Sequence, residues 1–129
     1  MTPAGRDVIL DRARESDFQQ HVLTLAARGG FHGVHIRVSH GSLEGLHSLS
    51  RAFPRSADHD DASGVPDLLL VQPARKLLLL PELKTAHGVV SAHQRRWLEW
   101  LLDIQDVRAP VWRPTDEAEL RAVLLGEPS

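Results

Sequence analysis

The segment GVPDLLLVQPARKLLLLPELKT, residues 64–85, constrains the fold more than any other part of the chain. It contains two apolar runs, 67–71 and 76–84, joined by QPAR, a short connection that is typical of an antiparallel hairpin. Because both runs are nearly continuous in Leu and Val, we predict a sheet that helices cover on both faces. Each run nevertheless carries charge at one end, and these charges are Asp67, Glu82 and Lys84.

A helix, a strand and a long loop are predicted before this hairpin. Apolar positions at helical spacing indicate a helix over 11–28 that ends at Gly29-Gly30, and its inner face consists of Phe18, Val22, Leu25 and Ala26. The segment FHGVHIRVS, 31–39, alternates as a half-buried strand does, and its inward residues are Val34, Ile36 and Val38. Residues 39–63 show no sustained period, so we predict a loop, and loops of this length are more often functional or mobile than idle.

Two helices and a strand are predicted after the hairpin. Ser91 and Gln94 fit a capping box that opens a helix, and the apolar face of this helix consists of Trp97, Leu98, Leu101 and Ile104. A short strand over 107–114 and a final helix capped by Thr115 follow. The chain has 129 residues, the length of one domain. We therefore predict a single-domain α/β sandwich, 1–129, with the order α-β-β-β-α-β-α.

The charges of the hairpin suggest a metal site. Residues i and i+2 of a strand share a face, so Glu82 and Lys84 project to the same side of the sheet. Asp67 opens the adjacent strand, where its side chain can approach Glu82. Two carboxylates close together in a poorly solvated cleft repel each other unless a proton or a cation lies between them. Hard oxygen donors, with the Leu83 carbonyl as a third, suit Mg²⁺ or Mn²⁺ rather than zinc.

A lysine beside such a metal suits phosphoryl chemistry. The Lys84 ammonium orients an attacking water and stabilises the extra negative charge of a five-coordinate phosphate, while the metal lowers the pKa of that water. Glu15 lies three residues before Phe18 on the same side of its helix, so we expect it to point toward the core and to complete the metal shell. Asp17 falls on the other side. These residues together predict a hydrolytic site for a phosphodiester.

The order of these residues resembles a known nuclease motif. Pro66-Asp67, followed by Glu82-Leu83-Lys84, resembles the motif of the PD-(D/E)XK superfamily. The stretches GVPDLLLV, ELKTAHGVVSAHQRRWLEWL and VWRP are similar to its VRR-NUC branch, and the resemblance runs from about Glu15 to Leu124. An upstream helical Glu and a downstream S-x-x-Q-x-x-W-L helix join the motif in the expected order. The resemblance implies a restriction-endonuclease-like core, in which helices flank a central mixed sheet.

The resemblance also implies roles for individual residues. The implied metal ligands are Asp67, Glu82, the Leu83 carbonyl and Glu15, and the implied catalytic residues are Glu15, Asp67, Glu82, Lys84 and Gln94. Asp17 competes with Glu15 for the role of the acid on the first helix, and the capping box is an alternative role for Gln94. Small stand-alone members, which occur in phages and bacteria, are expected to dimerise and to cut structured DNA such as junctions. We therefore expect a homodimeric DNA endonuclease that depends on Mg²⁺ or Mn²⁺.

Arginines supply candidate DNA contacts although the formal net charge is −2. Such a charge argues against coating of nucleic acid by bulk electrostatics, and it leaves room for local basic patches. The candidates are Arg95, Arg96, Arg113, Arg51 and Arg55. A solvated helix face is the alternative for Arg95 and Arg96, and Arg113 either anchors a phosphate or edges the sheet.

Two other functions fit the same charges. The first is a nuclease-fold protein that binds DNA without cutting it, as a junction-binding or accessory subunit. A pure binder, however, has no need to bury repelling carboxylates. The second is a homodimeric scaffold whose charges form interface salt bridges, which predicts that Asp67→Asn weakens the dimer and that no DNA binds.

The composition excludes several further classes. Apolar residues make up 42% of the chain and charged residues 25%, which is the balance of a soluble globular protein. The chain has no cysteine, hence no disulfide framework and no thiolate zinc site. Its longest apolar run, 77–80, is far shorter than the ~20 residues that span a bilayer. The charged N-terminal stretch lacks the apolar core of a signal peptide, so we expect a cytoplasmic protein without a membrane segment.

Overall fold

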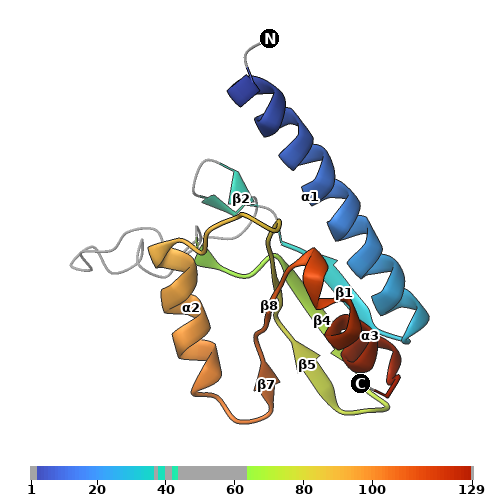
Figure 1. Ribbon diagram of the computed structural model, residues 1–129. Coiled ribbons are helices and arrows are strands. Elements are labelled where there is room, and N and C mark those ends of the chain that lie inside the picture. Colours follow the sequence, from blue (N-terminus) through green and yellow to red (C-terminus); the bar gives the residue numbers. More distant parts are fainter. Residues whose placement is uncertain (1–2, 37, 40–41, 44–63, 129) are drawn as a thin grey trace, which may run out of the picture. The chain divides into compact units, whose positions relative to one another are not determined.

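The computed structural model describes residues 3–36, 38–39, 42–43 and 64–128 (Figure 1). The chain groups into two compact units that interleave along the sequence. One unit, here called the helical unit, comprises Met1–His32, Leu83–Val89 and Val111–Ser129. The other, the sheet unit, comprises Gly33–Glu82 and Val90–Pro110. The assignment of the whole chain to a single domain stays a prediction.

The main sheet is mixed, as the sequence predicts. Its strands are β1 (His32–His35), β4 (Leu68–Gln72), β5 (Leu77–Leu79) and β7 (Val107–Arg108), in the order β1-β4-β5-β7. β4 and β5 pair antiparallel, whereas β5 and β7 pair parallel. Together with the helices described below, this sheet makes the chain a mixed α/β protein.

The predicted hairpin is confirmed as β4 and β5. Leu70 pairs with Leu79, and both side chains are buried. The connecting turn requires a left-handed residue at Lys76, whose φ is 55°. The predicted run over 76–84 is not one strand, because it breaks after β5 at Pro81, which has no N–H to donate. The chain resumes as β6 (Glu82–Leu83), which pairs with β8 (Val111–Trp112).

A helix of the sheet unit, α2 (Ala92–Leu102), contacts β7 (Figure 1). Its predicted capping box is confirmed, with Ser91 and Gln94 bonding each other reciprocally. Leu101 is buried as expected. Ile104 lies beyond the end of the helix and is 51% exposed, so its assignment to the apolar face is wrong.

The strand predicted over 31–39 is divided into β1 and β2 (Val38–Ser39). β2 pairs antiparallel with β3 (Ser42–Leu43), inside the segment predicted as a loop. Val34 is 59% exposed rather than inward, and the two preceding residues of β1 are exposed as well, so β1 does not alternate between a buried and an exposed side. Residues 44–63 lie outside the described residues, and so do the candidate DNA contacts Arg51 and Arg55.

The first helix, α1 (Pro3–Arg28), belongs to the helical unit and begins earlier than residue 11. Its predicted inner face is confirmed, because Phe18, Val22, Leu25 and Ala26 are all buried. The predicted stop at Gly29-Gly30 is also confirmed. Gly30 has a φ of 77°, and the Phe31 N–H donates to the Ala26 carbonyl at 2.9 Å, as in a Schellman motif.

The last helix, α3 (Glu117–Leu125), packs against α1 (Figure 1). Leu120 and Leu124 are fully buried, and a Cβ at Gly29 would clash with the Leu124 carbonyl, so the two helices approach closely there. The predicted cap at Thr115 is wrong, because the 3₁₀ turn η3 (Pro114–Asp116) precedes the helix. No helix among the described residues combines the length and the apolar character that crossing a bilayer requires.

Candidate functional site

The two hairpin acids lie where the β4–β5 ladder ends. Partner residues of this ladder include Gln72 with Leu77 and Leu70 with Leu79. The Leu68 N–H donates to the Pro81 carbonyl at 3.3 Å, which continues the same register. If this register continues by one residue beyond the Leu68–Pro81 hydrogen bond, Asp67 lies opposite Glu82. In an antiparallel ladder this is a pair without mutual hydrogen bonds, the type whose side chains lie closest together.

Glu82 is the more unusual of these acids because its side chain is only 2% exposed. A buried carboxylate costs free energy unless neighbouring groups compensate its charge. One oxygen, Oε1, accepts a hydrogen bond from Gln94 Nε2 at 2.8 Å. The Glu82 backbone N–H donates to the Pro110 carbonyl at 2.9 Å, which fixes the strand beneath the side chain. Asp67 is half-buried.

Gln94 joins this acid to the start of α2. Its side-chain oxygen accepts a hydrogen bond from the Ser91 N–H at 2.9 Å, and its amide nitrogen donates to Glu82. The sequence left open whether Gln94 caps the helix or lies beside the acids, and in the structure it does both. Its catalytic role stays a prediction.

Lys84 follows these acids but belongs to the helical unit. Its backbone N–H donates to the Trp112 carbonyl at 2.9 Å, and its side chain is half-buried. A Cβ built on Gly88 would lie 3.4 Å from the Lys84 Cδ, so the lysine side chain lies against the turn formed by residues 85–88. Alternate residues of an extended segment project to the same side. The shared side of Glu82 and Lys84 stays a prediction from the sequence.

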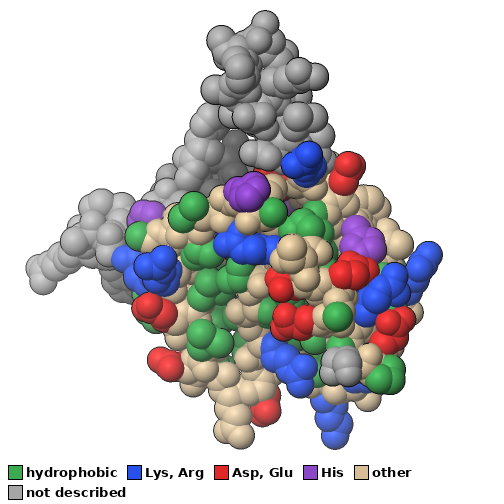
Figure 2. Space-filling model, in the orientation of Figure 1, with side chains coloured by type: hydrophobic (Ala, Val, Ile, Leu, Met, Phe, Trp, Pro, Cys, Tyr) green, Lys and Arg blue, Asp and Glu red, His purple; other side chains and the backbone are tan. Residues whose placement is uncertain are grey.

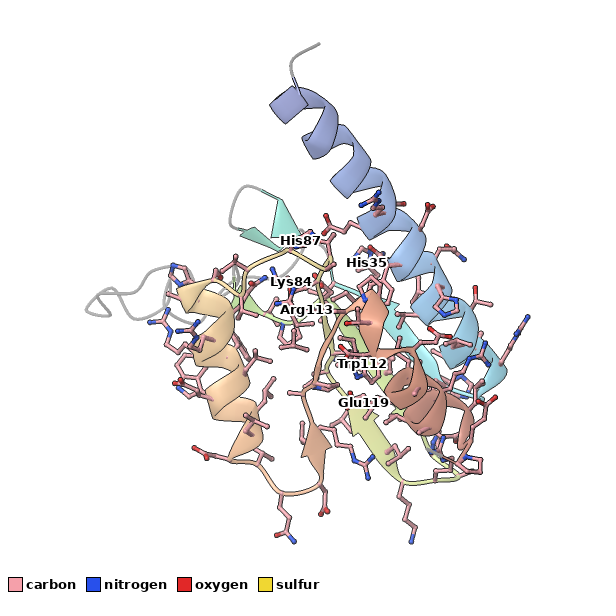
Figure 3. All side chains as sticks on the ribbon, in the orientation of Figure 1. His35, Lys84, His87, Trp112, Arg113 and Glu119 are labelled. Carbon is pink, nitrogen blue, oxygen red and sulfur yellow. The ribbon has the colours of Figure 1, made fainter. Side chains whose placement is uncertain are left out.

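Arg113 holds the turn that follows Lys84 (Figure 3). Its guanidinium Nη1 donates to the carbonyls of Thr85 and Gly88, each at 2.7 Å. The turn also contains a hydrogen bond from the Gly88 N–H to the Thr85 carbonyl at 3.2 Å. Arg113 therefore has a structural task in addition to the DNA contact that the sequence predicts, and that contact stays a prediction.

We expect Arg113→Ala to loosen this turn. Hydrogen bonds to charged donors each contribute about 1.5–3 kcal/mol, so native-state amide exchange at Gly88 should become at least about tenfold faster. Hydrogen exchange followed by NMR measures the effect, and Arg108→Ala removes an exposed arginine of the sheet unit as a matched control. Unchanged exchange at Gly88 would contradict this role for Arg113.

The candidate DNA contacts on α2 differ from each other. Arg95 is exposed. Arg96 is half-buried, with Nη2 2.9 Å from His93 Nδ1 and its guanidinium carbon 5.6 Å from the centroid of the Trp100 ring. Arg96 thus has local contacts that Arg95 does not share. Trp112 is fully buried and does not offer a face for stacking on bases.

The acids of α1 do not lie as the sequence predicts. Glu15 is exposed, so the expectation that it points toward the core is wrong. The helix residues just before Phe18, 14–17, are all exposed. Asp17 is also exposed, yet it lines a cavity of the helical unit together with Phe18 and His21.

This cavity, of about 450 Å³, is a feature that the sequence analysis missed. It lies between α1, the turn after Lys84 and the start of α3. At its wall His21 Nε2 is 2.8 Å from Glu117 Oε2, and Arg121 Nε donates to Glu117 Oε1 at 2.9 Å. Figure 2 accordingly shows acidic, basic and histidine side chains close together around α3. The i, i+3, i+4, i+7 spacing of Arg14, Asp17, Phe18 and His21 was the available signal.

The described residues contain no group of three His, Asp or Glu side chains that could hold a metal ion. Mg²⁺ sites often use only one or two carboxylates, with waters and substrate phosphates as the other ligands. The pair of Asp67 and Glu82 has this composition. Comparisons of the chain with protein-family models, with curated proteins and with solved structures give no match.

Proposed function

We propose that this chain is a metal-dependent deoxyribonuclease that hydrolyses phosphodiester bonds in branched or otherwise structured DNA. The observation that best supports the proposal is the position of Asp67 and Glu82, set opposite each other by the hairpin register with one of them almost wholly buried. Lys84 follows two residues later, and ammonium groups stabilise the charge that develops on a phosphoryl group.

The donor atoms of this segment fit Mg²⁺ or Mn²⁺. Asp67 and Glu82 offer carboxylate oxygens and Leu83 offers a backbone carbonyl, and all three are hard ligands. Gln94 orients Glu82 through the 2.8 Å hydrogen bond to Oε1, as partners of metal ligands commonly do. A bound divalent ion supplies Lewis-acid polarisation and a water of lowered pKa.

The chain's own residues perform the remaining tasks. The Lys84 ammonium orients the water that attacks phosphorus and offsets the negative charge of the five-coordinate transition state. The bond between phosphorus and the leaving oxygen breaks on the opposite side. Glu15 supplies a further carboxylate from α1, and Asp17 on the same helix is the alternative. Arg113 acts through the turn that it fixes beside Lys84.

We propose that the chain belongs to the PD-(D/E)XK superfamily and its VRR-NUC branch, with which its mixed α/β fold is compatible. In the proposed arrangement the Pro-Asp motif enters the first strand of a hairpin, and Glu-Leu-Lys follows the second. The mixed sheet and the glutamine-bearing helix α2 agree with that order. One chain of this size presents one active centre, so we propose a homodimer for cutting both strands of a duplex. Arg95 and Arg96 at the start of α2 are the proposed phosphate contacts of the described residues.

Cleavage of a panel of labelled DNAs tests this function. The panel contains a single strand, a duplex, a flap and a four-way junction, each with Mg²⁺, Mn²⁺ or EDTA. We expect the cation-containing reactions to cut a branched substrate and EDTA to stop the reaction, because the hydrolysis requires the metal-activated water. Binding of DNA without cutting under every metal would instead support the accessory protein, and neither binding nor cutting would support the scaffold.

A further inference from the structure

The cavity of the helical unit has the properties of a ligand site, and its lining contains neither Asp67 nor Glu82, the two hairpin acids of the proposed hydrolysis. Its volume of about 450 Å³ lies within the range of about 300–1,000 Å³ that small-molecule pockets occupy. Its lining comes from three segments that are distant in sequence, namely α1, residues 85–87 and the region 114–117. All of its lining residues belong to the helical unit, so the cavity is formed within that unit.

Apolar groups offer flat packing surfaces in this cavity. The apolar residues of the lining are Phe18, Pro114 and Ala86, and the first two have ring side chains. Phe18 is buried in the core of the helical unit, which keeps its ring in place. Planar aromatic ligands pack favourably on such surfaces.

The lining contains carboxylates that can accept hydrogen bonds from a ligand. Asp17 and Glu117 are both present, and Arg14 is the one arginine in the lining. Glu117 is held in place, because its oxygens contact His21 Nε2 at 2.8 and 3.0 Å. Carboxylates accept hydrogen bonds from N–H groups and repel phosphates. The lining therefore suits an uncharged ring with amino donors on its edge.

The cavity is also adjacent to the proposed catalytic lysine. Thr85, Ala86 and His87 line it, and they follow Lys84 directly in the chain. The Lys84 side chain lies against the same turn, which Arg113 fixes. A nucleotide next to a phosphate held by Lys84 would therefore lie near the segment that lines the cavity.

We infer that this cavity binds one unpaired nucleobase with an exocyclic amino group, from a nucleotide next to the phosphate that is cut. The inference rests on the proposed nuclease function for its biological meaning. The base packs on Phe18 and Pro114, and its amino group donates to Asp17 or Glu117. Such a pocket selects DNA that has an unpaired nucleotide, since a base in a duplex is stacked and paired.

Titration with uncharged deoxynucleosides in EDTA tests the inference without metal or cleavage. Chemical shifts are followed at the Ala86 amide and the His87 ring. Deoxyguanosine and deoxycytidine should bind saturably, and thymidine, which has no amino group, should bind at least tenfold more weakly. Ala86→Trp fills the cavity and should weaken binding of deoxyguanosine at least tenfold. Ala27→Trp, at an exposed position of α1 outside the lining, should leave the affinity unchanged.

A second variant tests the recognition itself. Asp17→Asn should reduce the preference for deoxyguanosine over thymidine and leave the fold intact, because Asp17 is exposed. The absence of saturable binding, or equal binding by Ala86→Trp and the unchanged protein, would overturn the inference. Cutting of DNA without nucleoside binding would refute this site alone, whereas nucleoside binding without cutting would refute the nuclease and keep the site.

Discussion

Replacement of Lys84 by alanine is expected to abolish DNA cleavage while the protein remains folded. We expect a loss of at least about a hundredfold to a thousandfold in the single-turnover rate, the scale observed when a group that stabilises transition-state charge is removed. The backbone bond from the Lys84 N–H to Trp112 does not involve the side chain, so β6 and β8 should stay paired. Single-turnover cleavage of a branched substrate with Mn²⁺ measures the rate.

Lys76 provides the matched control, since it is the only other lysine of the chain. It is exposed in the hairpin turn with a φ of 55°, and asparagine tolerates this conformation. Lys76→Asn should therefore retain full activity. Unimpaired cleavage by Lys84→Ala, with a circular dichroism spectrum like that of the unchanged protein, would refute the assignment of Lys84.

The parts of the fold that the sequence predicts correctly are those that local rules determine. Two leucine-rich runs with a short polar connection allow few structures other than a hairpin, and its register, continued beyond the paired residues, brings Asp67 opposite Glu82. Ser91 and Gln94 form a capping box from residues three apart. The contact between Gln94 and Glu82 joins two such local features, which is why the sequence suggested both partners.

The incorrect predictions concern which side chains are buried beneath other elements of the fold. Helical spacing places Glu15 on the same side of its helix as Phe18. The spacing does not show how far along the helix other elements pack against that side, and Glu15 is exposed. Alternation likewise places Val34 on the inner side of a strand, but three successive residues of β1 are exposed, and Val34 is 59% exposed. The cavity beside residues 85–87 is lined by three segments that are distant in sequence, so the helical spacing of its α1 residues could indicate one wall but not the other two.

Binding of Mn²⁺ is expected to stabilise the protein, and the acids of the hairpin should account for the effect. At a concentration about a hundredfold above the dissociation constant, a ligand that binds only the native state adds about 2.7 kcal/mol to the free energy of unfolding. We expect a rise of this size in denaturant unfolding, and we expect Glu82→Gln and Asp67→Asn to abolish it. Glutamine retains an oxygen that accepts the hydrogen bond from Gln94, so Glu82→Gln removes the charge with little change in shape.

Glu119→Gln and Asp103→Asn are the controls, because both remove an exposed carboxylate of the same type, and each should keep the full response to Mn²⁺. The result separates the three functions without any measurement of activity. A nuclease requires that Mn²⁺ binding depends on the charges of Asp67 and Glu82. A DNA-binding protein without a metal site would show no calorimetric or stability response that depends on Asp67. In a scaffold the same charges form interface salt bridges, so Asp67→Asn would lower the dimer affinity instead, and Mn²⁺ would leave the stability of every variant unchanged.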